Sequence, residues 1–149
     1  MRETETRMDI SAVRLDRELP LPTYAKPGDA GLDLRASETA TLAPGERRLV
    51  PTGLAIAISE GHAGMVLPRS GLAIQKGVTV LNAPGLIDSG YRGELKVLLI
   101  NHGAEPVTIA RGERIAQLVI QPVASATLVE VDRLPDSARG AGGFGSTGA

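Results

Sequence analysis

Short apolar runs broken by turn residues are the feature that most constrains the fold of this 149-residue chain. Runs rich in Val, Ile and Leu are separated by clusters of Gly, Pro, Asn or Asp, such as Pro44-Gly45 and Asn101-His102-Gly103. Many short strands with turn signals between them are typical of a β-sandwich or a barrel. We therefore expect strands at residues 11–15, 31–36, 47–51, 54–58, 64–68, 78–81, 94–100, 107–109, 114–120 and 126–131.

Helical periodicity is not sustained anywhere long enough to suggest alternating βαβ units. Residues 124–130 form the one stretch that also reads as a helical turn, in competition with the strand expected there. A chain of this length fits one domain and can bury a core without disulfides. The sequence thus predicts a single all-β domain over residues 1–149.

Charge and cysteine content exclude several classes of protein. The chain has 16 Lys and Arg against 17 Asp and Glu, so it lacks the basic excess of nucleic-acid binders. It has no Cys, which excludes a disulfide framework, a thiolate nucleophile and a Cys-based zinc site. No apolar stretch resembles a signal peptide or spans a bilayer. We expect a soluble, cytoplasmic protein that binds neither nucleic acid nor membrane.

The two ends of the chain differ from the body. Residues 1–9 are polar and charged, and we expect them to form a flexible leader. Residues 139–149 are mostly Gly and other small residues, which cannot bury enough apolar surface to order themselves. We therefore predict a mobile C-terminal tail that becomes ordered only where something docks it.

The tail glycines match the dinucleotide-binding pattern G-x-G-x-x-G at Gly140, Gly142 and Gly145. The match fails on context, because that fingerprint needs a strand before it and a helix after it. Glycines nevertheless let backbone N–H groups approach an anion closely, and Arg139 could complete such a phosphate site. Composition alone favours the alternative, a tail without function.

Phe144 shifts this balance towards function. The chain has two Tyr, one Phe and no Trp, and its one Phe lies in the tail, where it cannot reach a core. An apolar ring beside phosphate-binding glycines suggests a lid that stacks on a base, an interaction worth ~1–3 kcal/mol.

The segment Arg69-Ser70-Gly71 follows an apolar strand and could hold an oligophosphate through guanidinium, hydroxyl and backbone N–H donors. The alternative is a β-turn with a surface Arg. Ser70 is not a hydrolase nucleophile, because no G-x-S-x-G elbow surrounds it and only His62 and His102 are available as bases.

Residues 82–97 suggest two strands joined by a turn-rich segment, which we interpret as a hairpin. Its backbone groups could read the edge of a base, and the Asn82 amide is both a donor and an acceptor. Asp88 and Tyr91 lie in the turn-rich part. Taken alone, an ordinary turn Asp beside a packing Tyr explains them equally well.

Five segments follow one another along the chain, namely residues 29–34, 68–73, 85–97, 112–119 and 139–148. Together they resemble the dUTPase family, in which such segments occur in the same order. The family is a jelly-roll-like homotrimer with active sites at subunit interfaces, and it hydrolyses dUTP to dUMP and pyrophosphate. That activity keeps uracil out of DNA and supplies dUMP for thymidylate synthesis.

The resemblance implies a role for each matching residue. Asp88 would orient and deprotonate the water that attacks the α-phosphorus. Asn82 would read uracil, Tyr91 would pack on the deoxyribose and exclude a 2′-hydroxyl, and Asp33 would support the residues that touch substrate. Phosphate or tail contacts are implied for Arg69, Ser70, Gly71, Gln117, Arg139, Gly145, Ser146 and Thr147, and stacking on uracil for Phe144.

Magnesium fits this reading as a companion of the substrate, because Mg²⁺ keeps several waters and is commonly held by phosphate oxygens with few protein ligands. We expect no dedicated protein cage for it. His62 and His102 fall outside all five segments and are expected to be surface or turn residues.

Three other functions compete with this one. A dCTP deaminase would share the fold and the phosphate-binding segments, but the tail Phe144, Asn82 and the stretch 87–91 favour the pyrophosphatase. Release of ammonia from dCTP would reverse that choice. A non-catalytic trimer that binds a nucleotide or a protein is disfavoured by the presence of both Asp88 and the tail. A jelly-roll sugar-binding module would fail to bind dUTP.

Overall fold

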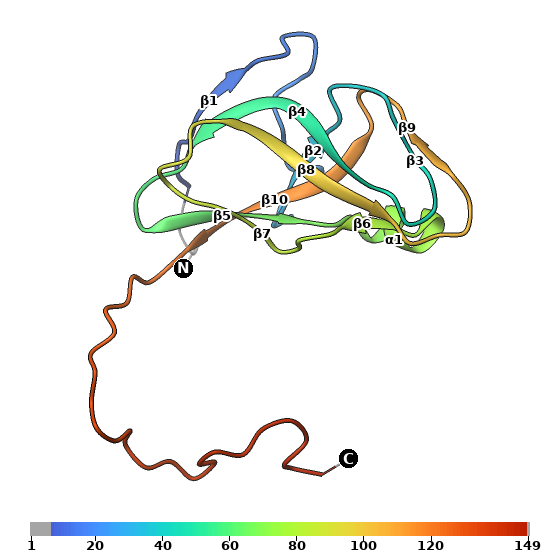
Figure 1. Cartoon of the computed structure of the whole chain (residues 1–149). Coiled ribbons are helices and arrows are strands. Elements are labelled where there is room, and N and C mark those ends of the chain that lie inside the picture. The colour runs from blue at the N-terminus through green and yellow to red at the C-terminus, as the bar shows by residue number, and fades with distance from the viewer. Residues whose placement is uncertain (1–6, 149) are drawn as a thin grey trace.

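A computed structural model describes residues 7–148, which form two four-stranded sheets and one two-stranded sheet (Figure 1). All strand pairs are antiparallel. The elements are β1 (Ser11–Arg14), β2 (Leu32–Arg35), β3 (Ala40–Leu42), β4 (Arg47–Ala57), β5 (His62–Leu67), α1 (Ser70–Lys76), β6 (Val78–Val80), β7 (Gly85–Ile87), β8 (Glu94–Asn101), β9 (Val107–Ile109) and β10 (Arg114–Pro122).

The strand order interleaves distant parts of the chain. The first sheet has the order β1-β4-β8-β6, the second β2-β10-β5-β7, and β3 pairs with β9. Neighbours that are far apart in sequence are characteristic of a sandwich with jelly-roll-like connections. The prediction of an all-β fold is confirmed, and in the described part of the chain the sheets stay open instead of closing into a barrel.

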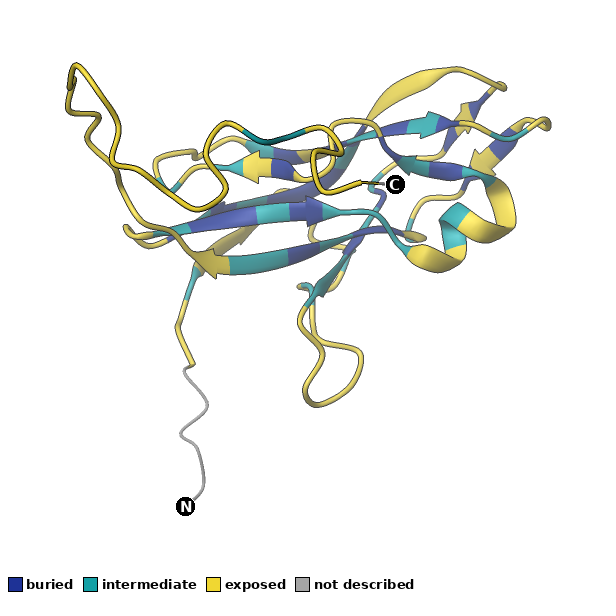
Figure 2. Ribbon diagram, turned by 90° about the horizontal axis from the view of Figure 1, so that it is seen from below, coloured by how far each residue is buried: buried dark blue, intermediate teal, exposed yellow. Residues whose placement is uncertain are grey.

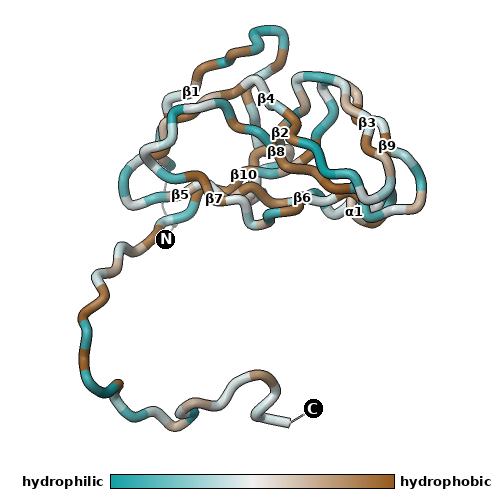
Figure 3. The backbone as a smooth tube through the Cα atoms, in the orientation of Figure 1, coloured by the Kyte–Doolittle hydropathy of each residue, from teal (hydrophilic) through white to brown (hydrophobic). Residues whose placement is uncertain are grey.

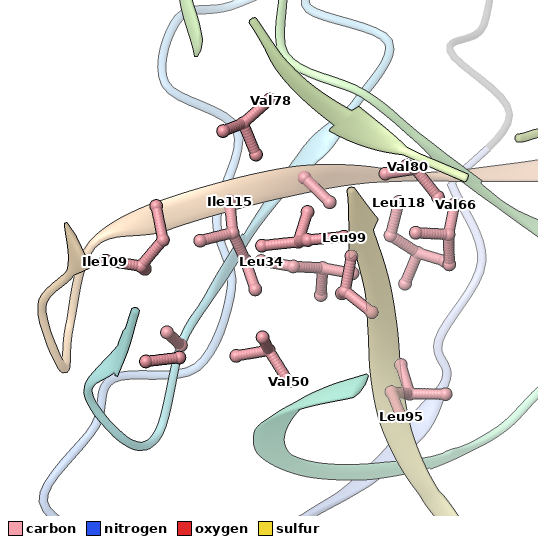
Figure 4. Close-up of a cluster of buried hydrophobic side chains, with 14 of the residues drawn as sticks. Leu34, Val50, Val66, Val78, Val80, Leu95, Leu99, Ile109, Ile115 and Leu118 are labelled. Carbon is pink, nitrogen blue, oxygen red and sulfur yellow. The ribbon is translucent and has the colours of Figure 1, made fainter. Parts of the chain in front are cut away.

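The core lies between the sheets and follows from alternation along the strands. In β8, Leu95, Val97 and Leu99 are buried while Lys96 points outward. Successive strand residues face opposite sides of a sheet, so this one strand supplies every second residue to the core. Figure 4 shows Leu99 packed among side chains from other strands, including Leu34 and Ile115. Burying each such side chain contributes about 1.5–3 kcal/mol.

Asn101 is a fully buried polar residue whose amide is completely bonded. Its Nδ2 donates to the carbonyls of Leu42 at 3.1 Å and Glu105 at 2.8 Å, and its Oδ1 accepts from the Gly103 N–H at 2.8 Å. A buried amide without partners would cost about 1–3 kcal/mol. Asn101 therefore fixes the turn after β8 that the sequence signals.

One strand, β4, covers residues for which the sequence predicts two. The predicted break coincides with a register shift between Pro51 and Ala55. Gly53 lies within it at φ +68°, a left-handed conformation that favours glycine. Thr52 is buried and donates its hydroxyl to the Leu95 carbonyl at 2.6 Å, which ties the bulge to β8. The chain thus bulges at this point without leaving the sheet.

The helix α1 lies where the sequence suggests only a turn. It has seven residues, none of them buried, and ends at Gly77, whose φ of +69° allows its N–H to bond the Ala73 carbonyl at 2.9 Å. So short a helix shows too little periodicity to be recognised. The three-residue strand β3 was likewise not predicted, whereas β7 lies within residues 82–97, for which two strands were predicted.

Residues 123–138 run away from the sandwich, and we call this segment the arm (Figures 1 and 3). Neither the strand predicted at 126–131 nor the alternative helical turn forms, so both predictions are wrong for the single chain. The arm is exposed throughout (Figure 2), with Leu128 at 96% exposure and Val129 and Leu134 at 78% each.

Within residues 7–148, no helix has the length and apolar character needed to cross a membrane.

Candidate functional site

The segment 82–97 is not the hairpin that the sequence suggests. Its first strand, β7, pairs with β5 in one sheet, and its second, β8, pairs with β4 and β6 in the other. The hairpin prediction is therefore wrong. The connection at residues 88–93 instead crosses from one sheet to the other, and it leaves backbone groups and side chains exposed at the crossing.

A hollow of about 320 Å³ lies beside this crossing, and we call it the Asp88 hollow. Asn82, Asp88, Tyr91 and Glu94 line it together with apolar residues such as Leu98. Its volume falls in the range of about 300–1,000 Å³ typical of small-molecule sites. The structure thus brings together three of the residues implicated by the sequence, namely Asn82, Asp88 and Tyr91.

The connection is a compact turn held by its own hydrogen bonds. The Tyr91 N–H donates to the Asp88 carbonyl at 3.1 Å, and the Tyr91 hydroxyl donates to the Glu94 carbonyl at 2.8 Å. Arg92 Nη1 donates to the Ser89 carbonyl at 2.7 Å. The Asp88 carboxylate is exposed, and no group in the described part of the chain pairs with it. It can therefore accept a proton from a water or a ligand.

A second group of side chains converges on Asp33, whose side chain is only 17% exposed. Arg69 Nε lies 3.9 Å from Oδ1 of Asp33, and Arg114 Nη1 lies 3.5 Å from Oδ2. Arg69 Nη1 also donates to the Arg114 carbonyl at 3.1 Å. Asp33 on β2 and Arg114 on β10 thus hold the Arg69 guanidinium at the start of α1.

Gln117 belongs to the same group through strand pairing. It faces Asp33 on β2 and Leu67 on β5, and its Nε2 donates to the Pro68 carbonyl at 3.1 Å. Gly31 makes room for it, because a Cβ at that position would lie 2.8 Å from the Gln117 Oε1. The Gln117 amide is therefore packed into place.

The Arg69 hollow, of about 640 Å³, opens beside this group and is rich in cations. Guanidinium groups bind phosphate in a bidentate manner, so such a surface suits an oligophosphate. Gly71 also lines this hollow, whereas Ser70 is exposed as the first residue of α1. The charged residues of the lining are Arg35, Arg69, Lys76, Arg111, Glu113 and Arg114.

Arg111 differs from the other cations because its guanidinium is already engaged. It pairs with the Asp16 carboxylate through both terminal nitrogens and with Glu18 Oε2 at 2.9 Å, and it donates to the Ser37 carbonyl at 2.8 Å. The hydrogen bond from Arg111 holds the pKa of Asp16 below its ordinary value, and the same bond raises the pKa of Arg111. Arg111 thus anchors the loop after β1 instead of binding a ligand.

The tail lies at the end of the arm, away from the sandwich (Figure 1). Its hydrogen bonds are local, as in the 2.7 Å bond from Arg139 Nε to the Gly142 carbonyl. Phe144 is fully exposed and has a φ of +48°, which is uncommon for a residue with a side chain. Gly145, Ser146 and Thr147 follow it in exposed turns. Within one chain, the tail residues meet none of the others implicated by the sequence.

Two residues that the sequence did not single out belong to the candidate site. Arg114 shares Asp33 with Arg69, and Glu94 both lines the Asp88 hollow and accepts the Tyr91 hydroxyl. Both residues lie in segments that resemble the dUTPase family, and this was the one sign in the sequence that pointed to them. Their contacts with Asp33 and Tyr91 are visible only in the structure. His62 and His102 line neither hollow, as expected.

Comparison with known proteins identifies the family. The dUTPase family model matches residues 17–148. A deoxyuridine 5'-triphosphate nucleotidohydrolase of Anaeromyxobacter sp. (strain Fw109-5) is 67% identical over 130 residues, which make up 87% of this chain and 88% of the relative. The enzyme of the same name from Thermobifida fusca (strain YX) is 64% identical over 136 residues, covering 91% of this chain and 76% of the relative.

Solved structures agree with the sequence relatives. The dUTPase of Staphylococcus bacteriophage 80alpha with dUPNHPP superposes with a TM-score of 0.88 at 29% identity, covering 95% of this chain and 99% of the other. A dUTPase from phage phi11 of S. aureus, in which a structural Mg(II) ion is coordinated, shares the fold with a TM-score of 0.81 at 24% identity, covering 87% and 100%. The chain belongs to the dUTPase family of deoxyuridine 5'-triphosphate nucleotidohydrolases.

Proposed function

We propose that Asp88 is the general base of dUTP hydrolysis in this chain. The carboxylate takes a proton from a water as the water oxygen bonds to the α-phosphorus. The bond from that phosphorus to the oxygen bridging to the β-phosphate then breaks, which releases pyrophosphate and leaves dUMP. The observation that carries the proposal is an exposed, unpaired carboxylate at the mouth of a nucleoside-sized hollow. General-base catalysis contributes about 10²–10⁴-fold.

The Asp88 hollow is proposed to hold the nucleoside. The Asn82 amide supplies a donor and an acceptor that match the uracil edge, and the nearby backbone supplies further groups. Cytosine presents the opposite polarity at its 4-amino group, and a polar group left unpaired can cost about 10⁴-fold in specificity. Tyr91 packs against the deoxyribose and leaves no room for a 2′-hydroxyl.

The Arg69 hollow is proposed to hold the phosphates. Arg69, Ser70, Gly71 and Gln117 supply guanidinium, hydroxyl, backbone N–H and amide donors at the start of α1 and on β10. Asp33 does not reach the substrate and instead orients Arg69. Oriented donors stabilise the charge of the transition state without having to reorganise during the reaction.

We propose a homotrimer whose active sites combine residues of different subunits. Asn82, Asp88 and Tyr91 line one hollow of the chain, Arg69 and Gly71 line another, and the tail lies away from the sandwich at the end of the arm. A head-to-tail contact that closes into a ring can bring the Asp88 hollow of one copy to the Arg69 hollow of the next.

Exposed apolar surface supports an assembly. Leu49 and Leu86 line the Asp88 hollow and are 53% and 62% exposed, and the arm presents Leu128 and Leu134. Apolar surface of this kind is covered in proteins that assemble. An arm directed onto another subunit would carry Arg139 to Thr147 to that subunit's site, where Arg139 and the glycine-rich turn contact phosphate and Phe144 stacks on uracil.

Magnesium is proposed to enter with the substrate. Mg²⁺ keeps several waters and is commonly held by phosphate oxygens with few protein ligands, so the substrate can supply most of its ligands. When bound, Mg²⁺ neutralises charge on the triphosphate.

A pyrophosphate-release assay with dUTP, dCTP, dTTP and UTP tests the function. We expect turnover of dUTP alone, and loss of that turnover when EDTA removes magnesium. Comparable hydrolysis of the four nucleotides would contradict the proposed nucleoside hollow. Ammonia release from dCTP would identify a deaminase instead.

A further inference from the structure

We propose that Gly93 positions Tyr91, and that the missing side chain at residue 93 thereby sets how strictly the enzyme excludes ribonucleotides. The inference rests on the sugar-packing role proposed for Tyr91. It concerns a residue that contacts no substrate and acts through the ring of its neighbour.

The Tyr91 ring folds back over Gly93. A Cβ built on Gly93 would lie 2.5 Å from the Tyr91 hydroxyl oxygen, 2.7 Å from Cζ and 3.1 Å from Cε2. Real Cβ atoms do not make contacts this short, so any residue other than glycine would displace the ring. The close approach is what allows the Tyr91 hydroxyl to reach the Glu94 carbonyl at 2.8 Å.

A side chain at residue 93 would move Tyr91 more easily than it would move the backbone. Gly93 does not have a positive φ, so an alanine can adopt its conformation without strain. The clashing atoms are the far end of a side chain that is 46% exposed and can rotate outward. Gly93→Ala is therefore expected to fold normally with Tyr91 out of place.

Glu94 anchors the other end of this arrangement to the sandwich. Its Oε2 accepts the Gly53 N–H at 2.9 Å, within the β4 bulge. The Gly53 carbonyl in turn accepts the Leu15 N–H at 2.7 Å and the Asp16 N–H at 3.1 Å. The bulge thus fixes the Glu94 carbonyl that accepts the Tyr91 hydroxyl. This hydrogen bond holds the Tyr91 ring in one position at the Asp88 hollow.

Such a fixed ring can exclude a 2′-hydroxyl where a mobile one cannot. An apolar pocket rejects an added hydroxyl by about 10²-fold at most, so a small displacement of its wall removes much of the discrimination. We expect Gly93→Ala to lower the ratio of kcat/KM for dUTP to that for UTP by about tenfold. Gly90→Ala is the matched control, because Gly90 lies in the same connection with nothing within 4 Å of an added Cβ.

A second readout reports the ring directly and needs no substrate. The chain has two Tyr and no Trp, so Tyr24→Phe leaves Tyr91 as the single source of tyrosine fluorescence. In that background, Gly93→Ala should increase quenching of Tyr91 by iodide, and Gly90→Ala should not. Unchanged quenching would overturn the positioning role, even if selectivity falls. Increased quenching with unchanged selectivity would support the positioning and refute the sugar role of Tyr91.

The Glu94 anchor gives a rescue test. Glu94→Ala removes the acceptor for the Gly53 N–H and should both loosen Tyr91 and reduce the dUTP to UTP ratio. Glu94→Gln retains a side-chain oxygen that can accept the same hydrogen bond, and it should restore both values. If Glu94→Gln behaves like Glu94→Ala, the anchoring role of this hydrogen bond is wrong.

Discussion

Arg69, the residue before α1, lies beside Asp33 on β2, with the guanidinium Nε 3.9 Å from the carboxylate Oδ1. Arg114 approaches the other carboxylate oxygen at 3.5 Å. One partly buried carboxylate therefore orients two guanidinium groups at the hollow proposed for phosphate. We therefore expect Asp33 to act on the substrate only through these arginines.

Asp33→Asn should weaken phosphate binding without stopping the reaction. Partly exposed ion pairs contribute about 0.2–1 kcal/mol, so we expect kcat/KM for dUTP to fall about two- to fivefold, mainly through KM. Steady-state kinetics measure this effect. Glu38→Gln is the control, because it neutralises an exposed carboxylate outside the candidate site. A fall in kcat as large as the one expected for Asp88→Asn would instead indicate a direct catalytic role for Asp33.

Much of the fold follows from the sequence because β-strand alternation and turn residues are local signals. The strand at Val107–Ile109 was predicted with its observed bounds, and the body was recognised as all-β. The three-residue strand β3 and the seven-residue α1 were missed because so few residues show no periodicity. The partners of β7 and β8 were mistaken because sequence proximity suggests pairing, while the sandwich places these strands in different sheets.

Asp88→Asn tests the proposed base directly. The amide nearly preserves the shape of the side chain and cannot accept the proton, so kcat should fall about 10²–10⁴-fold. Affinity for a non-hydrolysable dUTP analogue should stay close to that of the unmodified chain. Pyrophosphate release and equilibrium binding measure the two effects. Unchanged turnover in a pure Asp88→Asn sample would remove Asp88 from the role.

The Arg111–Asp16 pair predicts a pH-dependent contribution to stability. Its hydrogen bond holds the pKa of folded Asp16 below the ordinary 3.8, so the contribution is complete above that value and is lost as pH falls through the folded pKa. In urea unfolding, the midpoint difference between the unmodified chain and Asp16→Asn should stay constant from pH 7 to about 5 and shrink towards about pH 3.

Arg111→Met provides the matched test of that cause, because it removes the guanidinium donor and leaves the Asp16 carboxylate. It should abolish the same pH-dependent part of the difference. A difference that does not change with pH in either variant would mean that the pair does not contribute through ionisation of Asp16.

The site was predictable as a set of residues but not as an arrangement. Asn82, Asp88 and Tyr91 meet in one hollow because they are close in sequence as well as in space. The contact between Asp33 and Arg69 depends on the pairing of β2, β10 and β5, which no local pattern encodes. The closeness of Gly93 to the Tyr91 ring depends on a single side-chain orientation.

Phe144→Ala should impair catalysis and leave stability unchanged. The ring is fully exposed in the single chain and contributes nothing to its core. Stacking on a base is worth ~1–3 kcal/mol, so kcat/KM should fall about five- to 150-fold. Thermal unfolding without nucleotide should match the unmodified chain, whereas Leu99→Ala, a buried truncation, should lower the Tm clearly. A similar loss of Tm for both variants would make Phe144 structural.

Complementation between two inactive variants tests whether the site is shared. The first variant is Asp88→Asn, and the second is truncated before Arg139, so that it keeps Asp88 and the arm but lacks the tail. Each should be inactive when unfolded and refolded alone. Refolded together in equal amounts, they should form mixed trimers, whose composition native mass spectrometry can establish.

The shared-site proposal predicts how much activity returns. Suppose that Asp88 and Phe144 of one site come from different chains. The chain that supplies residue 88 is the truncated variant, with an intact Asp88, in one half of the sites. The chain that supplies the tail is independently Asp88→Asn, with an intact Phe144, in one half of the sites. About one quarter of the sites in randomly mixed rings should then be complete. A self-contained site predicts none, because no single chain carries both parts. Mixed trimers without activity above that of the separate variants would therefore show that Asp88 and the tail act within one subunit.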